Sequence, residues 1–120
     1  MKLNLFGGAE PTLNQVQILI QLINNVLAEI EPPQLLHIPY ARIEVPEGEE
    51  ELWGEGWVPK KLNLDGINLL DARSEEALAQ AKDPVIFING GPQRDLLYEE
   101  ITKNKSLYDL VVHARCIIGE

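Results

Sequence analysis

The sequence predicts an α/β domain in which an open, mostly parallel sheet of about five strands carries three to four helices on its two faces. Three observations lead to this prediction. Short apolar segments alternate along the chain with segments of helical period, as in strand–helix–strand units. The strand-like segments are apolar on both faces, which is typical of a covered parallel sheet. Turns rich in glycine and proline separate the segments.

The first predicted unit is a strand at 2–6, a turn at Gly7 and Gly8, and a helix at 12–30. Polar and apolar residues alternate in the strand, and the two glycines end it. Apolar residues then recur at spacings of three and four, which places them on one face of a helix. Thr12 begins a capping-box pattern at the start of this helix. Two prolines follow the periodic segment, so the helix is expected to end before them.

A second strand is predicted at 34–41, where nearly every residue is apolar. The next stretch, 42–60, contains five glutamates and two tryptophans within positions 47 to 57 and has no dominant period, so we interpret it as an acidic loop insertion. Two interpretations of this loop stay open. Trp53, Trp57 and the glutamates would line a pocket for a cationic substrate, or the loop is solvated and its tryptophans pack back on the domain. The second is the more common behaviour of such a run.

The remaining segments continue the alternation of strands and helices. Ser74 is expected to cap a short helix, and Ser106 a last one. Between them a helix opens after Gly90-Gly91, with Pro92 at its first position. The predicted strands are 61–71, interrupted near Asp65-Gly66, then 84–90 and 114–119. We find no domain boundary, so residues 1–120 form a single α/β domain or the N-terminal half of one.

Composition excludes several classes of function. The 120 residues carry a formal net charge of −9, which disfavours binding to nucleic acid or to anionic membranes. No apolar run approaches the ~18–20 residues needed to span a bilayer. Cys116 is the single cysteine, so an internal disulfide is impossible and a reducing cytoplasm is the expected location.

Candidate functional positions follow from the expected sheet, because open α/β sheets place their sites beyond the carboxyl ends of strands. Glycines mark three such ends, at Gly7-Gly8, at Asn89-Gly90-Gly91 and at Gly119. The Asn89-Gly90-Gly91-Pro92 stretch before a helix is a candidate cradle for an anion or oxyanion, and the alternative is a tight turn without function. No dinucleotide or nucleoside triphosphate motif is present, so no cofactor is expected.

The chain's own nucleophiles and bases are expected to be structural. Ser74 and Ser106 lie at helix starts, where serine usually caps. His37 falls inside an apolar strand and His113 at a helix-to-strand junction, so we interpret both as satisfied core or boundary histidines. Cys116 lies mid-strand and is expected to be a small buried hydrophobe. His113 and Cys116 lack further ligands at zinc spacing, so no metal site is predicted.

Four stretches resemble, in order, the N-terminal half of the dipeptidase E and cyanophycinase family of serine peptidases: LNLFGG, LLHIPYA, PVIFINGGPQRDLL and CIIGE. That family is similar in fold to class I glutamine amidotransferases, which implies a flavodoxin-like sheet. Gly90 and Gly91 match the family's glycine turn. Gly119 and Glu120 match the first two positions of its G-x-S-A-G nucleophile elbow, whose next residue would be the serine.

The resemblance implies hydrolysis of a peptide or amide bond by a serine nucleophile and a histidine base. It places Gly90 and Gly91 at the oxyanion, and Gly119 and Glu120 at the elbow. A possible substrate pocket would contain Gly7, Gly8, Asn89 and Arg94. The family's nucleophile, base and acidic partner would lie beyond residue 120, so the chain is expected to be inactive unless a second, C-terminal chain completes the site. Pro92 departs from the family pattern because it has no N–H to donate.

The alternative hypothesis is a non-catalytic α/β module that binds or assembles with another chain. A half-sheet that ends on the apolar strand at 116–119 would expose an edge, and a homo-oligomer or a partner chain would cover it.

Overall fold

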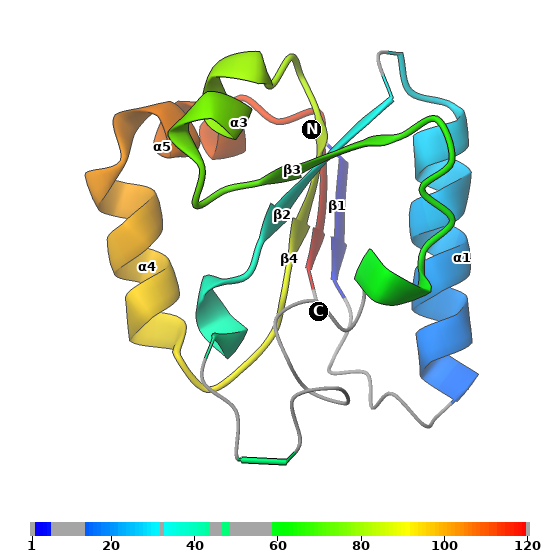
Figure 1. Ribbon diagram of the computed structural model, residues 1–120, viewed down its shortest axis with the longest axis horizontal. Helices are drawn as coiled ribbons and strands as arrows, with labels where there is room; N and C mark the ends of the chain where they lie inside the picture. Colours follow the sequence, from blue (N-terminus) through cyan, green and yellow to red (C-terminus); the bar gives the residue numbers. More distant parts are fainter. Residues whose placement is uncertain (1, 6–13, 32, 44–46, 49–58, 120) are drawn as a thin grey trace.

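The computed structural model describes residues 2–5, 14–31, 33–43, 47–48 and 59–119, which form a five-stranded sheet between two layers of helix (Figure 1). All strand pairs are parallel, and the strand order is β1-β5-β4-β2-β3. The strands are β1 (Lys2–Leu5), β2 (Gln34–Ile38), β3 (Asn68–Asp71), β4 (Val85–Ile88) and β5 (Cys116–Gly119). The helices are α1 (Asn14–Ala28), α3 (Glu75–Gln80), α4 (Arg94–Lys103) and α5 (Lys105–Val112), with 3-10 turns η1 (Tyr40–Arg42) and η2 (Pro59–Lys61). The predicted α/β class and open parallel sheet are confirmed.

Two hydrophobic cores lie on the two faces of the sheet. Helix α1 covers one face, and α3, α4 and α5 cover the other (Figure 1). Alternate residues of each strand enter opposite cores, as the pleat requires, so Leu35 packs on the α1 face and Leu36 on the other. On α1, the predicted helical period buries Leu19, Ile23 and Leu27. Thr12, the predicted cap of this helix, lies outside the described residues.

The chain reverses its direction of travel across the sheet after β3. After β2 it moves outward to β3, and it then crosses back to place β4 on the other side of β2. This reversal makes the carboxyl ends of β2 and β4 a topological switch point, where open α/β sheets form binding crevices. Ile38 and Ile88 stand side by side there in register.

The predicted exposed edge at 116–119 is wrong. Strand β5 pairs with β4 on one side and with β1 on the other, with Leu3 opposite Ile117, so β5 lies inside the sheet. The sequence predicts the strand at 114–119 but does not assign its neighbours in the sheet. The pairing of β5 with β1 joins segments from opposite ends of the sequence. Within the described residues the edges are β1 and β3.

Of three predicted helix starts, one is confirmed and two shift. Ser74 does cap α3, and its hydroxyl accepts a hydrogen bond from the Ala77 N–H at 3.2 Å. Ser106 does not cap α5, because Asn104 holds that position and accepts from the Leu107 N–H at 3.2 Å. Pro92 lies before the cap of α4, which is Gln93, so it is not the first helical residue.

The remaining strands are shorter than predicted. Gly66 has a φ of +74° in a turn, so β3 begins only at Asn68. Cys116 begins β5 and does not lie mid-strand, although it is buried as expected. Of the acidic insertion at 42–60, positions 44–46 and 49–58 lie outside the described residues, and with them Trp53 and Trp57. No helix in the described ranges combines the length and the apolar character needed to cross a bilayer.

Candidate functional site

A cavity of about 590 Å³ opens at the carboxyl ends of β4 and β5. It brings together five of the residues predicted for a site, namely Asn89, Gly90, Gly91, Arg94 and Gly119. Gly7, Gly8 and Glu120, which complete the predicted set, lie outside the described residues. The cavity is also lined by Leu3, Ala41, Ile88, Leu97 and Ile117.

The floor of this cavity is apolar, and its rim is the turn after β4. Ile88, Leu97 and Ile117 all belong to the hydrophobic core on the α4 face of the sheet. Gly119 stands opposite Ile88 in the register of β5 with β4. The end of β5 therefore lies directly beside the turn at Gly90 and Gly91.

The turn at Gly90 and Gly91 packs closely against the segment after β2. A Cβ atom at Gly91 would overlap the carbonyl oxygen of Ala41 and lie 2.9 Å from Cβ of Arg42, so a side chain at this position requires the backbone to move. The same Ala41 oxygen accepts a hydrogen bond from the Gln93 N–H at 3.0 Å. Arg42 Nε donates to the Gly90 carbonyl oxygen at 2.8 Å. The turn is thus fixed by η1.

The N–H groups of Gly90 and Gly91 are the donors that an anion in this cavity would meet. We find no hydrogen bond from either N–H to another residue in the described part of the chain. The neighbouring backbone groups do have partners. The Gly90 carbonyl oxygen accepts from Arg42 Nε, and the Gln93 N–H donates to the Ala41 carbonyl oxygen. A fixed turn whose N–H groups meet no acceptor among the described residues would be suited to bind a negatively charged oxygen.

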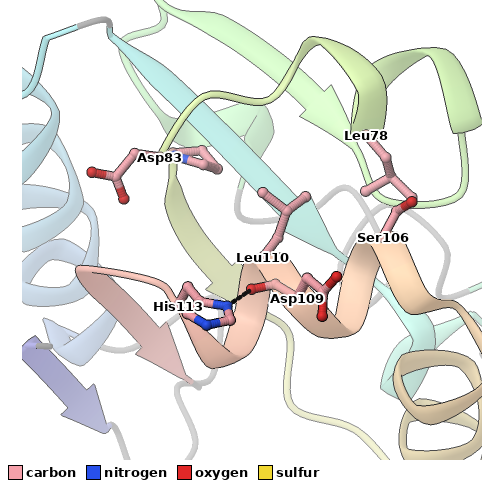
Figure 2. A pocket seen from close by; sticks show the side chains of 7 residues that line it. Leu78, Asp83, Ser106, Asp109, Leu110 and His113 are labelled. Atoms are coloured by element: carbon pink, nitrogen blue, oxygen red, sulfur yellow. Dashed lines mark hydrogen bonds between the residues drawn. The ribbon is translucent and has the colours of Figure 1, made fainter.

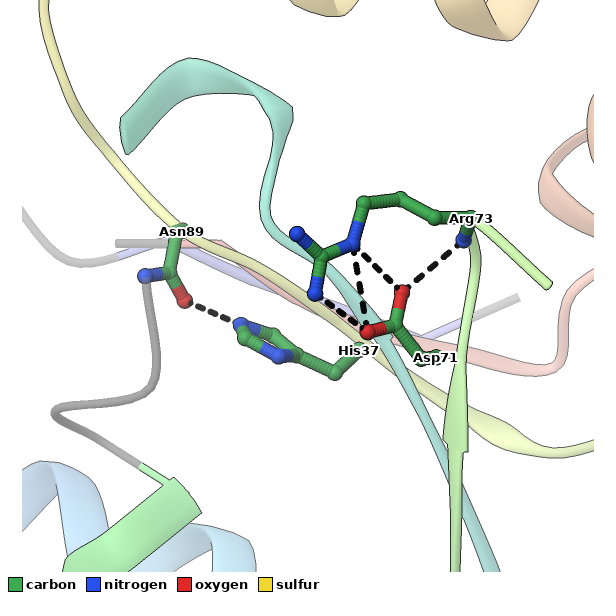
Figure 3. Close-up of polar contacts among 4 residues, drawn as sticks. All are labelled: His37, Asp71, Arg73 and Asn89. Atoms are coloured by element: carbon green, nitrogen blue, oxygen red, sulfur yellow. Dashed lines mark hydrogen bonds and ion pairs between the residues drawn. The ribbon is translucent and has the colours of Figure 1, made fainter. Parts of the chain in front are cut away.

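Behind the turn, on the α1 face, His37 bonds to Asn89 (Figure 3). His37 Nε2 lies 2.7 Å from Asn89 Oδ1, and the two residues are only 6 % and 1 % exposed. The imidazole stacks on Phe87, with ring centroids 5.6 Å apart. The interpretation of His37 as a satisfied core histidine is confirmed.

Asp71, in register with His37 on β3, forms an ion pair with Arg73 (Figure 3). Arg73 Nη2 lies 2.6 Å from Asp71 Oδ2, and Arg73 Nε lies 3.0 Å from Oδ1. The hydrogen bond from the Arg73 side chain lowers the pKa of Asp71 from its usual value. In η1, burial first and the carboxylate of Glu100 second raise the pKa of Tyr40, so its phenol stays neutral.

A second cavity, of about 530 Å³, lies at the opposite end of the sheet (Figure 2). It contains both Ser106 and His113, but these are two turns apart on α5, about 10 Å along the axis, with Leu110 between them. His113 Nδ1 instead bonds to the Asp109 carbonyl oxygen at 2.9 Å. Ser106 and His113 therefore do not form a nucleophile–base pair with each other, and His113 stands at the predicted helix-to-strand junction.

Sequence reasoning missed Ala41, Arg42 and the partnership of His37 with Asn89. The rule that sites follow the carboxyl ends of strands, applied to the second strand as well as to the fourth, would have indicated Ala41 and Arg42. The contact of His37 with Asn89 depends on the pairing of β2 with β4, which no local pattern reports. Within the described residues no cluster of histidine, cysteine and carboxylate side chains is suited to hold a metal ion.

Comparison with protein-family models finds no match for this chain, and comparison with curated proteins finds no relative. The resemblance to the dipeptidase E family therefore depends on the short motifs alone.

Proposed function

We propose that this chain is the part of a serine hydrolase, similar to dipeptidase E, that supplies the oxyanion-binding turn for hydrolysis of a peptide or amide bond. One observation carries the proposal. The glycine turn after β4 and Gly119 at the end of β5 line one cavity, although nearly thirty residues separate them in the sequence. A nucleophile that follows β5 would therefore enter beside the turn after β4.

In this mechanism the N–H groups of Gly90 and Gly91 donate to the oxygen of the tetrahedral intermediate. Pro92 has no N–H, so the two glycines must supply the donors. Because η1 already holds the turn, little reorganisation is required when the charge develops. Each such donor is typically worth about 10²- to 10³-fold in kcat.

The nucleophile and its base must come from elsewhere. Among its described residues, the cavity contains no serine, cysteine or histidine. We place the serine directly after Glu120, on a continuing or separate C-terminal chain that also brings the histidine. The substrate would be a peptide or related amide, with Arg94 and the turn that begins at Asn89 at its pocket. Cys116, the single cysteine of the sequence, is buried, which is consistent with a reducing cytoplasm.

The test adds the polypeptide that the gene encodes after Glu120 and treats the completed protein with a fluorophosphonate probe. We expect labelling at the serine that follows Glu120. Gly91→Ala should reduce the labelling rate by about 100-fold, because the new Cβ displaces the turn. Ser106→Ala is the control, since Ser106 lies at the other end of the sheet.

Two results would contradict the proposal: no labelling of the completed protein, or labelling of Ser74 or Ser106. Circular dichroism and a thermal melt of Gly91→Ala separate a displaced turn from an unfolded chain.

A non-catalytic assembly module is the second candidate, and one observation favours it. Leu3, on the outer strand β1, keeps 52 % of its surface exposed beside the apolar floor of the cavity. A homo-oligomer or a partner chain would cover this side chain and the strand edge.

A further inference from the structure

We propose that His37 is a positioning residue, which holds the Gly90–Gly91 turn in place through Asn89. It acts from the face of the sheet opposite the cavity. The structural part of this inference stands on the contacts alone, and its consequence for reaction rate rests on the proposed function.

The sheet fixes the orientation of the His37 ring. Register places His37 between Asp71 on β3 and Phe87 on β4. The ring stacks on Phe87 with an interplanar angle of 19°, and Phe87 is itself fully buried in the core under α1. Rotation of the imidazole would break this packing, so Nε2 points steadily at Asn89 (Figure 3).

The hydrogen bond also requires a proton on Nε2 of His37. An amide oxygen only accepts, so Nε2 must carry the proton that it shares with Asn89 Oδ1. Asn89 is 1 % exposed, and water has no access to replace this donor. Loss of the imidazole would remove this donor from a buried acceptor, which costs free energy.

Asn89 passes this constraint to the glycines that follow it. Its backbone N–H donates to the Ile38 carbonyl oxygen at 3.2 Å, and its side chain accepts from His37, so two neighbouring residues of β2 hold it. Gly90 and Gly91 have no side chains with which to fix themselves. Asn89 therefore sets where the turn leaves the sheet, and the contacts with η1 set where it goes next.

A histidine that merely fills the core would behave differently. The apolar neighbours Leu35 and Phe87 on this face would accept a leucine of similar volume at position 37. The His37–Asn89 pair instead places two polar side chains in the interior, and its hydrogen bond joins β2 to the first residue after β4. This arrangement indicates that His37 orients Asn89 rather than merely filling the core.

The first experiment is nuclear magnetic resonance on the isolated chain, which needs no catalytic activity. The ¹⁵N spectrum of wild-type His37 should show a protonated Nε2. His37→Leu should shift the amide signals of Gly90 and Gly91. His37→Gln, whose amide nitrogen can reach Asn89 as Nε2 does, should return them at least halfway to their wild-type positions.

Leu35→Ala is the matched control, because Leu35 is buried on the same strand and the same face. It should destabilise the chain but leave the Gly90 and Gly91 signals unchanged. The inference is overturned if Nε2 of His37 carries no proton, or if His37→Leu moves the glycine signals no further than Leu35→Ala does. If His37→Leu does not fold, the site of the proton on wild-type His37 and the His37→Gln spectrum still decide whether His37 positions the turn.

The second experiment measures hydrolysis by the completed protein. His37→Leu should lower kcat about tenfold with little change in KM, because a displaced donor weakens only the transition state. His37→Gln should recover most of that loss. If the completed protein hydrolyses nothing, the proposed function fails while the spectra still test the positioning role. If it is active and His37→Leu keeps full kcat, the positioning role fails alone.

Discussion

The ion pair of Asp71 and Arg73 is the best-defined charged contact near the candidate site. Arg73 approaches the carboxylate with Nε and Nη2, and its backbone N–H donates to Asp71 Oδ1 at 2.9 Å. Both side chains are about 40 % exposed, so solvent screens much of the attraction. A pair of this kind stabilises a protein by about 0.5 kcal/mol.

Arg73→Met should lower the free energy of unfolding by about 0.5 kcal/mol at pH 7. The folded protein lowers the pKa of Asp71 below its unfolded value of 3.8. The stabilisation is therefore fully present above pH 3.8 and is lost as the pH falls through the lower, folded pKa. Urea unfolding of both proteins at a series of pH values measures the difference. A difference that persists unchanged at pH 2 would contradict the assignment.

At the scale of elements, Asn104 joins two helices. It ends α4 and caps α5 in an extended conformation, with φ −98° and ψ 103°. Its side-chain oxygen accepts from Leu107 N–H, which would otherwise lack a partner in the first turn of α5. Leu107, fully buried, is thereby held in the core under α3 and α5.

Asn104→Ala should lower the free energy of unfolding by about 1 kcal/mol, the usual value of a lost cap. Asn104→Asp should retain most of the stabilisation by the cap, because a carboxylate also accepts from the Leu107 N–H. Ser106→Ala is the control and should change stability by less than about 0.5 kcal/mol. Urea denaturation compares all four proteins. An equal loss in Asn104→Ala and Ser106→Ala would show that Ser106 contributes to the cap after all.

Elements with a strong local signal could be predicted from the sequence, as could the start of α3 at Ser74, whereas most other element ends could not. The period of three and four found α1, and the apolar runs found β2 and β4. Asn104 and Ser106 are both good capping residues two positions apart, and the packing of Leu107 decides between them. Pro92 is compatible with the start of a helix, but the Gln93 N–H is held by Ala41, which delays the first turn of α4.

At the scale of the whole molecule, part of the candidate site could be predicted from the sequence and part could not. Glycine turns at strand ends indicated Asn89, Gly90, Gly91 and Gly119, and in the structure these residues line one cavity. The residues that hold the turn, His37 and Arg42, come from β2 and η1. Arg42 follows the end of β2, so the strand-end rule would have indicated it. The contact of His37 with Asn89 follows from strand order, which is decided by contacts between distant segments and leaves no local pattern in the sequence.

The outer edge of β1 gives a prediction about self-association. If the chain assembles through this edge, Leu3→Lys should shift it to a monomer at concentrations where the wild type associates, because a charge would have to enter the contact. Ile18→Lys, on α1 and 60 % exposed, is the matched control and should not change association. Sedimentation velocity over a range of concentrations measures both. A wild-type chain that is monomeric throughout would remove the support for the assembly module.

The pairing of β1 with β5 also bears on the order in which the chain folds. Lys2 lies opposite Cys116, so the contact closes a loop of almost the entire chain, and β1 has no other strand partner among the described residues. Loop closure costs more entropy as the loop lengthens, so β1 should dock after β2, β3, β4 and β5 have already joined. During synthesis β1 would therefore wait, without its partner strand, until residues 116–119 have left the ribosome.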